Sequence, residues 1–208
     1  MRNSIPMRAL TGGVLCLAIL GGMIVGHAWP LWTGRTVVLA AAVLGKGEPH
    51  ASGQYLRLST PAMQLALDEA QNGGSAATYV KTVGAGWDTS TNDPGWGRAI
   101  RGHVVFVQLE AGADGSYAPV SVSFAPVAGA TNLRGRVRGW RAGPQQGAST
   151  PRTLLVDCGL EAYYLEQGQA ERVAAQIGKA GSVQMEVAIA ASGQARIARL
   201  LVNGQPVS

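Results

Sequence analysis

The most constraining feature of the sequence is an apolar run close to its N-terminus. Residues 9–34 carry no charged side chain, and their first part reads ALTGGVLCLAILGGMIV. A helix rises about 1.5 Å per residue, so roughly 25 residues cross the ~30 Å hydrocarbon layer of a bilayer. The run therefore predicts a transmembrane signal-anchor helix over residues 9–32 that contacts the lipid bilayer.

The charges around this run predict its orientation. Arg2 and Arg8 precede it, and only Arg35 follows it closely. Because positive charge is retained on the cytoplasmic side of a membrane segment, residues 1–8 are expected in the cytoplasm. Residues 33–208 are then expected outside, as the extracytoplasmic domain of a single-pass inner-membrane protein.

A cleaved secretory signal is the main alternative to an uncleaved anchor. Gly26-His27-Ala28 offers a small-x-small cleavage site, although His27 and the Trp-Pro pair that follows are unusual there. A lipoprotein signal fits less well, because Leu15 precedes Cys16 where a small residue is needed. Each alternative also exports the rest of the chain, so the expected location of the domain is the same.

The exported part has the pattern of many short β-strands. Residues 53–59 alternate, with Tyr55 and Arg57 on one side and Leu56 and Leu58 on the other, as in a half-buried strand. Turn signals separate the candidate strands, and the chain has 29 glycines. The candidates are residues 36–39, 53–59, 103–109, 117–124, 152–157, 160–165, 183–190 and 195–202. Roughly eight strands predict a mainly β domain, either a sandwich or barrel-like.

Two stretches have helical patterns instead. Thr60 and Pro61 can serve as the N-cap and first residue of a helix that ends before Asn72-Gly73. Residues 169–177 are a second, shorter candidate. The domain is therefore expected to contain one or two short helices.

A glycine-rich polar loop is expected between the strands. Residues 84–97 read GAGWDTSTNDPGWG and carry Trp87 and Trp96. These indoles either dock on a ligand or membrane interface or fold back over a small core.

One strand carries a known family signature. The segment GQYLRLST resembles the motif of the bacterial GDYXXLXY family, because Gly53, Tyr55 and Leu58 match it. Gln54 stands where the motif has an acidic residue, and Thr60 stands where it has an aromatic one. These departures argue against a catalytic acid at this position.

A second block near the C-terminus is similar to the same family. The segment GLEAYYLEQG contains Gly159, Glu161, Tyr163 and Tyr164 in the family's order of glycine, acid and aromatic pair. The resemblance implies a membrane-anchored, exported β-rich protein without an assigned activity, with an integral-membrane protein as a partner. We therefore expect a non-enzymatic binding or assembly module for another envelope component.

No catalytic, metal or cofactor site is predicted. His27, His50 and His103 lack metal-ligand spacing, and no GxSxG motif is present. Asp157 and Glu161 could form a carboxylate pair, but Glu161 is expected to be a solvated strand residue or a local hydrogen-bond partner. An envelope hydrolase with a site built from dispersed residues remains the alternative.

The most pronounced charged feature is a stripe of arginines. In an extended strand Arg134, Arg136, Arg138 and Trp140 project from one face. Such a stripe could bind an anion, lipid headgroups or an acidic partner, or be a solvated strand face. Nucleic acid is not an expected partner, because without the two N-terminal arginines 17 − 2 = 15 basic residues face 12 acidic ones, a net +3.

Overall fold

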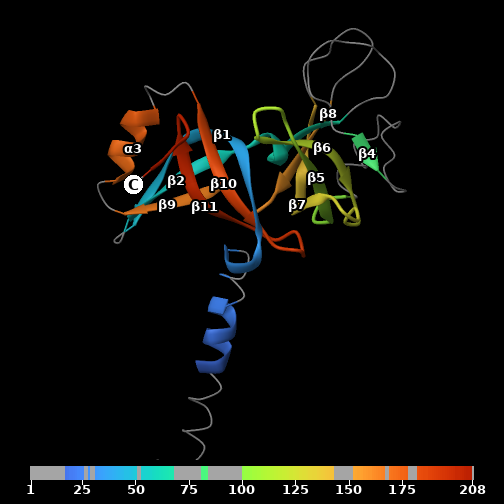
Figure 1. Cartoon of the computed structure of the whole chain (residues 1–208), viewed down its shortest axis with the longest axis horizontal. Helices are drawn as coiled ribbons and strands as arrows, with labels where there is room; N and C mark the ends of the chain where they lie inside the picture. The colour runs from blue at the N-terminus through green and yellow to red at the C-terminus, as the bar shows by residue number, and fades with distance from the viewer. Residues whose placement is uncertain are drawn as a thin grey trace, which may run out of the picture.

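The computed structural model describes residues 17–25, 28, 31–50, 53–67, 81–83, 100–142, 152–166, 169–177 and 182–207. This part is mainly β, as predicted (Figure 1). Its strands are β1 (Arg35–His50), β2 (Gly53–Ser59), β3 (Gln64–Leu67), β4 (Lys81–Val83), β5 (Val104–Ala111), β6 (Tyr117–Ser123), β7 (Thr131–Ala142), β8 (Arg152–Asp157), β9 (Ala162–Glu166), β10 (Val183–Ile189), β11 (Ala195–Val202) and β12 (Gln205–Pro206). A 3-10 turn, η1 (Pro61–Met63), and a helix, α3 (Gln169–Ile177), complete the named elements.

The long strand β1 pairs with different neighbours along its length. Its first half pairs antiparallel with β10, from Arg35 opposite Ile189 onward. Its second half pairs antiparallel with β2, and the register shifts near Gly45, whose φ is +143°. A β-bulge of this kind bends a strand and lets it pair with different neighbours along its length.

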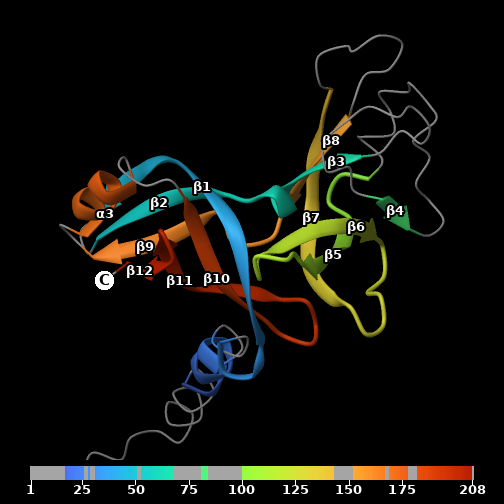
Figure 2. The same cartoon turned by 45° about the horizontal axis from the view of Figure 1, so that its top comes forward.

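The strands form one open network. Hydrogen-bonded neighbours follow the order β12-β11-β10-β1-β6-β5-β7-β8-β3, while β2 extends from β1 and β9 extends from β2. Within the described ranges this path has two ends, so the expected sandwich or barrel is replaced by an open sheet. Figure 2 shows two groups of strands: β1, β2 and β9–β12 form the first group, and β3–β8 form the second. β2 leads through η1 into β3 and so passes from the first group to the second.

One hydrophobic core serves both groups. It includes Leu56 of β2 and Met185 of β10 together with Leu133 of β7 and Leu154 of β8, all essentially inaccessible to solvent. Leucine and valine at alternate positions direct one face of each strand inward. The core therefore holds the two groups in one unit.

The predicted hairpins are confirmed. β5 and β6 pair antiparallel across a turn in which Gly115 has a φ of +78°. β10 and β11 pair in the same way across a turn in which Gly193 has a φ of +82°. Glycine adopts this left-handed conformation without steric cost, which explains its place in both turns.

The predicted helix after Thr60 is wrong, whereas the helix at residues 169–177 is confirmed as α3. Thr60 makes no side-chain cap, and only the single turn η1 follows it. Gln64 then begins β3, which pairs with β8 and buries Leu65 completely. Pairing with a distant strand overrides the local helical pattern.

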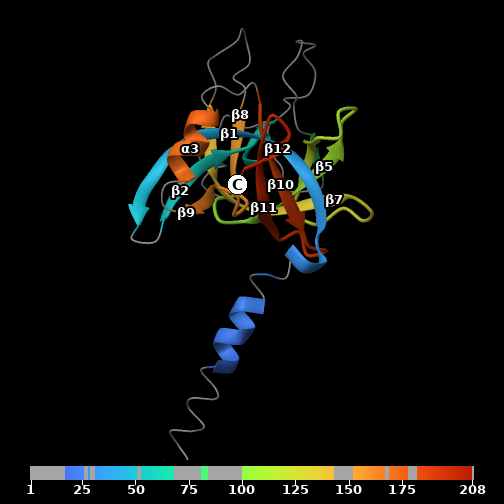
Figure 3. The same cartoon turned by 60° about the vertical axis from the view of Figure 1, so that its left-hand side comes forward.

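The N-terminal segment stands apart from the strands (Figures 1 and 3). Residues 17–25 are helical, and six of their apolar side chains are exposed, between 44% and 71%. In the residues that were described, no helix is both long enough and apolar enough to cross a membrane. The expected cytoplasmic tail at residues 1–8 and the loop with Trp87 and Trp96 lie outside the described residues.

Candidate functional site

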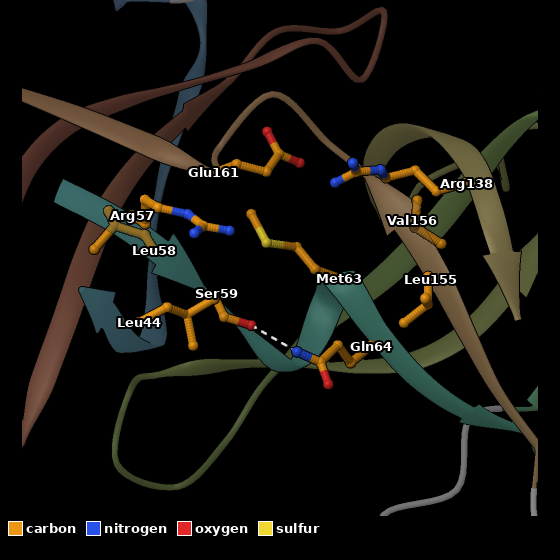
Figure 4. A pocket seen from close by; sticks show the side chains of 10 residues that line it. All are labelled: Leu44, Arg57, Leu58, Ser59, Met63, Gln64, Arg138, Leu155, Val156 and Glu161. Carbon is orange, nitrogen blue, oxygen red and sulfur yellow. Dashed lines mark hydrogen bonds between the residues drawn. The ribbon is translucent and has the colours of Figure 1, made fainter. Parts of the chain in front are cut away.

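A pocket of about 180 Å³ lies between the two groups of strands (Figure 4). Ten side chains line it: Leu44, Arg57, Leu58, Ser59, Met63, Gln64, Arg138, Leu155, Val156 and Glu161. The arginines and Glu161 contribute charged groups, while most of the other side chains are apolar. We refer to this site as the arginine pocket.

β2 forms one wall of the arginine pocket. Its alternation is as predicted, because Leu56 and Leu58 are buried whereas Tyr55 and Arg57 are exposed. Arg57 therefore extends along the rim, and its guanidinium turns toward the space in front of Met63 (Figure 4).

The turn η1 forms the floor. The Met63 amide donates to the Thr60 carbonyl over 2.9 Å and closes the turn, which carries Met63 into the pocket. The Gln64 side-chain amide donates to the Ser59 hydroxyl over 3.0 Å (Figure 4). Thr60, where the family motif has an aromatic residue, is itself buried.

β7 forms the opposite wall and carries the predicted stripe. Arg134, Arg136 and Arg138 are exposed, and the residues between them are buried, so the expected alternation is present. The three arginines nevertheless lie in different surroundings. Arg136 donates to the Gly102 carbonyl over 2.8 Å, and only Arg138 lines the pocket.

The turn between β8 and β9 completes the pocket. The Cys158 amide donates to the Glu161 carboxylate over 2.9 Å, and the Gly159 amide donates to Asp157 over 3.1 Å. The Glu161 carbonyl accepts a 2.8 Å bond from the Leu58 amide, which ties the turn to β2. Glu161 is thus a local hydrogen-bond partner, one of the two roles expected for it.

The titration of Glu161 is shifted by its surroundings. Burial raises the pKa of the half-buried Glu161 carboxyl, and a side-chain hydrogen bond with Asp157 raises it further. Burial also raises the pKa of the Cys158 thiol, so this free, buried cysteine stays protonated.

The carboxyl pair has a geometry unlike that of a glycosidase. Asp157 and Glu161 are within hydrogen-bonding reach of each other, whereas glycosidase carboxyls stand about 5 Å or more apart. In the described portion of the chain, no three His, Cys, Asp or Glu side chains gather as they would around a metal ion.

The family-motif residues away from the pocket lie on the β2–β9 pair. Gly53 pairs with Glu166, and Tyr55 pairs with Tyr164. The two tyrosine rings meet edge to face, with centroids 5.3 Å apart, and both remain partly exposed. The two motifs, far apart in sequence, are therefore neighbouring strands.

The remaining candidate residues take structural positions in this region. Gln54 pairs with Leu165, and Tyr163 packs against the core. Gly159 has a φ of +73°, which the β8–β9 turn requires. Trp140 is half-buried opposite Leu154, outside the lining of the arginine pocket.

The structure thus brings together three of the residues named from sequence, Leu58, Arg138 and Glu161. Sequence reasoning missed Arg57 and Met63 as pocket residues. Arg57 lies at a variable position inside the first motif, and a single exposed arginine in a strand is too common to mark a site.

The fold and the pocket define a small, open-sheet β protein with an amphipathic pocket. The chain matches the GDYXXLXY protein family over residues 16–200, and it belongs to that family. No curated protein and no solved structure matches it significantly.

Proposed function

We propose that this protein is a membrane-tethered binding module of the bacterial envelope that engages an envelope or membrane component through the arginine pocket. The observation that carries this proposal is the convergence of Arg57 and Arg138 on a pocket that both family motifs help to line (Figure 4). A concave site with apolar walls and a few directed charged groups is typical of ligand and partner recognition.

The tether in this proposal is the N-terminal segment, residues 9–32, with residues 1–8 in the cytoplasm. Its support is the charge-free sequence and the exposed apolar side chains of residues 17–25, which have no apolar surface against them in the described ranges. Apolar side chains this exposed are stabilised by transfer into lipid.

The topology is tested by fusing alkaline phosphatase after Ser208. The fusion should be active, because the enzyme folds only outside the cytoplasm, and the same fusion without residues 2–34 should be inactive. Equal activity of both fusions in intact cells would contradict the proposed export.

The binding role is tested by purifying the tagged full chain from gently solubilised membranes. A stoichiometric membrane partner should be recovered, and its recovery should be lost when Arg57 and Arg138 are both replaced by Glu. Arg134→Glu is the matched control, because Arg134 is an exposed arginine of β7 outside the pocket. Equal recovery with the double variant and the control would remove the pocket from the interaction.

A further inference from the structure

The arginine pocket holds two cationic groups that the fold does not use. Among the residues that the structure describes, neither the Arg57 side chain nor the Arg138 side chain makes a hydrogen bond or ion pair, although the Arg136 side chain does. Figure 4 shows both guanidinium groups directed toward the space around Met63. A guanidinium presents a planar fork of N–H donors that matches the two oxygens of a carboxylate.

Most of the remaining wall is apolar, with Ser59 and Gln64 as its neutral polar side chains. Leu44 lies on one side of the pocket and the neighbouring side chains of Leu155 and Val156 lie on the other, with the thioether of Met63 between the two sides (Figure 4). The volume, about 180 Å³, is well above the space that a single water molecule needs. A carboxylate with an aliphatic chain of about three or four carbons fills such a space.

Glu161 is the acidic group on this surface. Arg57 faces it from β2 and Arg138 from β7, while Asp157 and the Cys158 thiol adjoin it at the end of β8. The guanidinium of Arg196, on β11, lies near the same turn beside Gly159. An ionised Glu161 places a negative charge on the pocket lining, which repels a bound anion, and protonation removes that charge.

We infer that the arginine pocket binds a carboxylate carrying a short aliphatic chain, and that protonation of Glu161 strengthens this binding. The inference rests on the proposed binding role and specifies its ligand chemistry. Affinity for the carboxylate falls as the pH rises and Glu161 loses its proton. The raised pKa of Glu161 moves this change above the ordinary range of a glutamate.

Pentanoate is the probe, and the methionine methyl groups are the reporter. The full chain in a neutral detergent is labelled with ¹³C-methyl methionine, and Met63→Leu assigns the Met63 signal. Pentanoate should shift the Met63 signal saturably and leave that of Met185, a fully buried core residue outside the pocket, unchanged. Pentanol, which has the same chain without the charge, should bind far more weakly.

Substitutions separate the charged contacts from general effects. Arg57→Gln and Arg138→Gln should each weaken pentanoate binding about tenfold or more, since each removes a charge-assisted hydrogen bond. Arg134→Gln should change the affinity by less than about twofold, because this residue lies outside the pocket. Glu161→Gln should abolish the fall in affinity with rising pH at pH values where pentanoate itself is fully ionised.

A second experiment tests whether the bound carboxylate belongs to a small free acid or to the C-terminus of a polypeptide. An acetylated tripeptide ending in leucine is compared with its C-terminal amide. Tighter binding of the peptide acid than of pentanoate would identify a chain end as the source, and weaker binding would identify a free acid; both agree with the inference.

Three results would overturn the inference: equal shifts with pentanol and pentanoate, tighter binding of inorganic phosphate than of pentanoate, or equal affinities in Arg138→Gln and Arg134→Gln. If pentanoate fails to bind while partner recovery still depends on Arg57 and Arg138, only the ligand chemistry is wrong. Loss of the partner dependence alone would instead refute the proposed interaction.

Discussion

The two ends of the β7–β8 pair are built in opposite ways. At Gly135 the strands are packed so closely that a Cβ atom would lie 2.3 Å from Val156 Cγ1 and 3.0 Å from the Asp157 carbonyl oxygen. Beyond the register shift between Val137 and Gly139, a Cβ on Gly139 would meet only the Arg101 guanidinium at 3.6 Å. Within one strand pair, the backbones therefore approach closely at Gly135 and leave room for a side chain at Gly139.

This difference shows that a glycine and a β-bulge change a strand in different ways. The missing side chain at Gly135 permits a close backbone approach, whereas the bulge between Val137 and Gly139 leaves Arg138 without a paired residue on β8. Arg136 and Arg138, although only two residues apart, consequently take different roles. Each prediction below tests one part of this contrast.

The largest effect is expected from Gly135→Ala. The added methyl group overlaps a buried valine and the backbone of β8, so the free energy of unfolding should fall by about 1–3 kcal/mol. Urea denaturation followed by circular dichroism measures the change.

Gly139→Ala is the matched control, because its methyl group would make only ordinary contact. It should alter the free energy of unfolding by less than about 0.5 kcal/mol. Equal losses in the two variants would show that the close packing is not confined to Gly135.

An intermediate effect is expected on the arginines. Arg136→Ala removes the 2.8 Å bond to the Gly102 carbonyl and should cost about 1 kcal/mol of stability. Arg138→Ala removes no bond within the described structure and should cost less than about 0.5 kcal/mol. The same urea titration compares the two variants. A larger loss of unfolding free energy in Arg138→Ala than in Arg136→Ala would contradict a structural role for Arg136 and a binding role for Arg138.

The smallest effect is expected on the pH dependence of stability. The pKa of Glu161 is raised in the folded chain, so the unfolded chain releases this proton first as the pH rises from the ordinary glutamate pKa of about 4.3. The free energy of unfolding should therefore fall with rising pH until the folded carboxyl has also ionised. Glu161 is only half-buried, so solvent screening keeps the change small.

Glu161→Gln checks this sign, because the amide still accepts a bond from Cys158 but cannot ionise. Urea midpoints at several pH values should show a fall in the parent protein that is reduced in the variant. An identical pH profile for both proteins would exclude Glu161 as its source.

Local patterns predicted much of the fold. The bounds of β2 and the two hairpins follow from alternation and from glycine turns, both of which are properties of short segments. The helix expected after Thr60 failed because β3 depends on β8, which is distant in the sequence. The open sheet was not predicted for the same reason. The pairing of β1 with both β10 and β2 depends on segments that are distant in the sequence.

The candidate site was predictable in parts. Leu58 and Glu161 were marked by the family motifs, and Arg138 was marked by the charge stripe, but their proximity depends on tertiary pairing. The pairing of β2 with β9 and the bulge in β7 bring them to one place. Arg57 lacked a distinguishing pattern because a single exposed arginine in a strand is common.

β1 limits the distance between the N-terminal segment and the arginine pocket. The strand begins at Arg35, directly after the N-terminal segment, and Leu44 in the same strand lines the arginine pocket. At about 3.3 Å per residue, this path is at most about 30 Å long. If the N-terminal segment lies in a bilayer as proposed, β1 keeps the arginine pocket within about 30 Å of the end of that segment. A ligand or partner must therefore bind within that distance of the membrane. A partner protein anchored in the same membrane can reach the pocket at this distance.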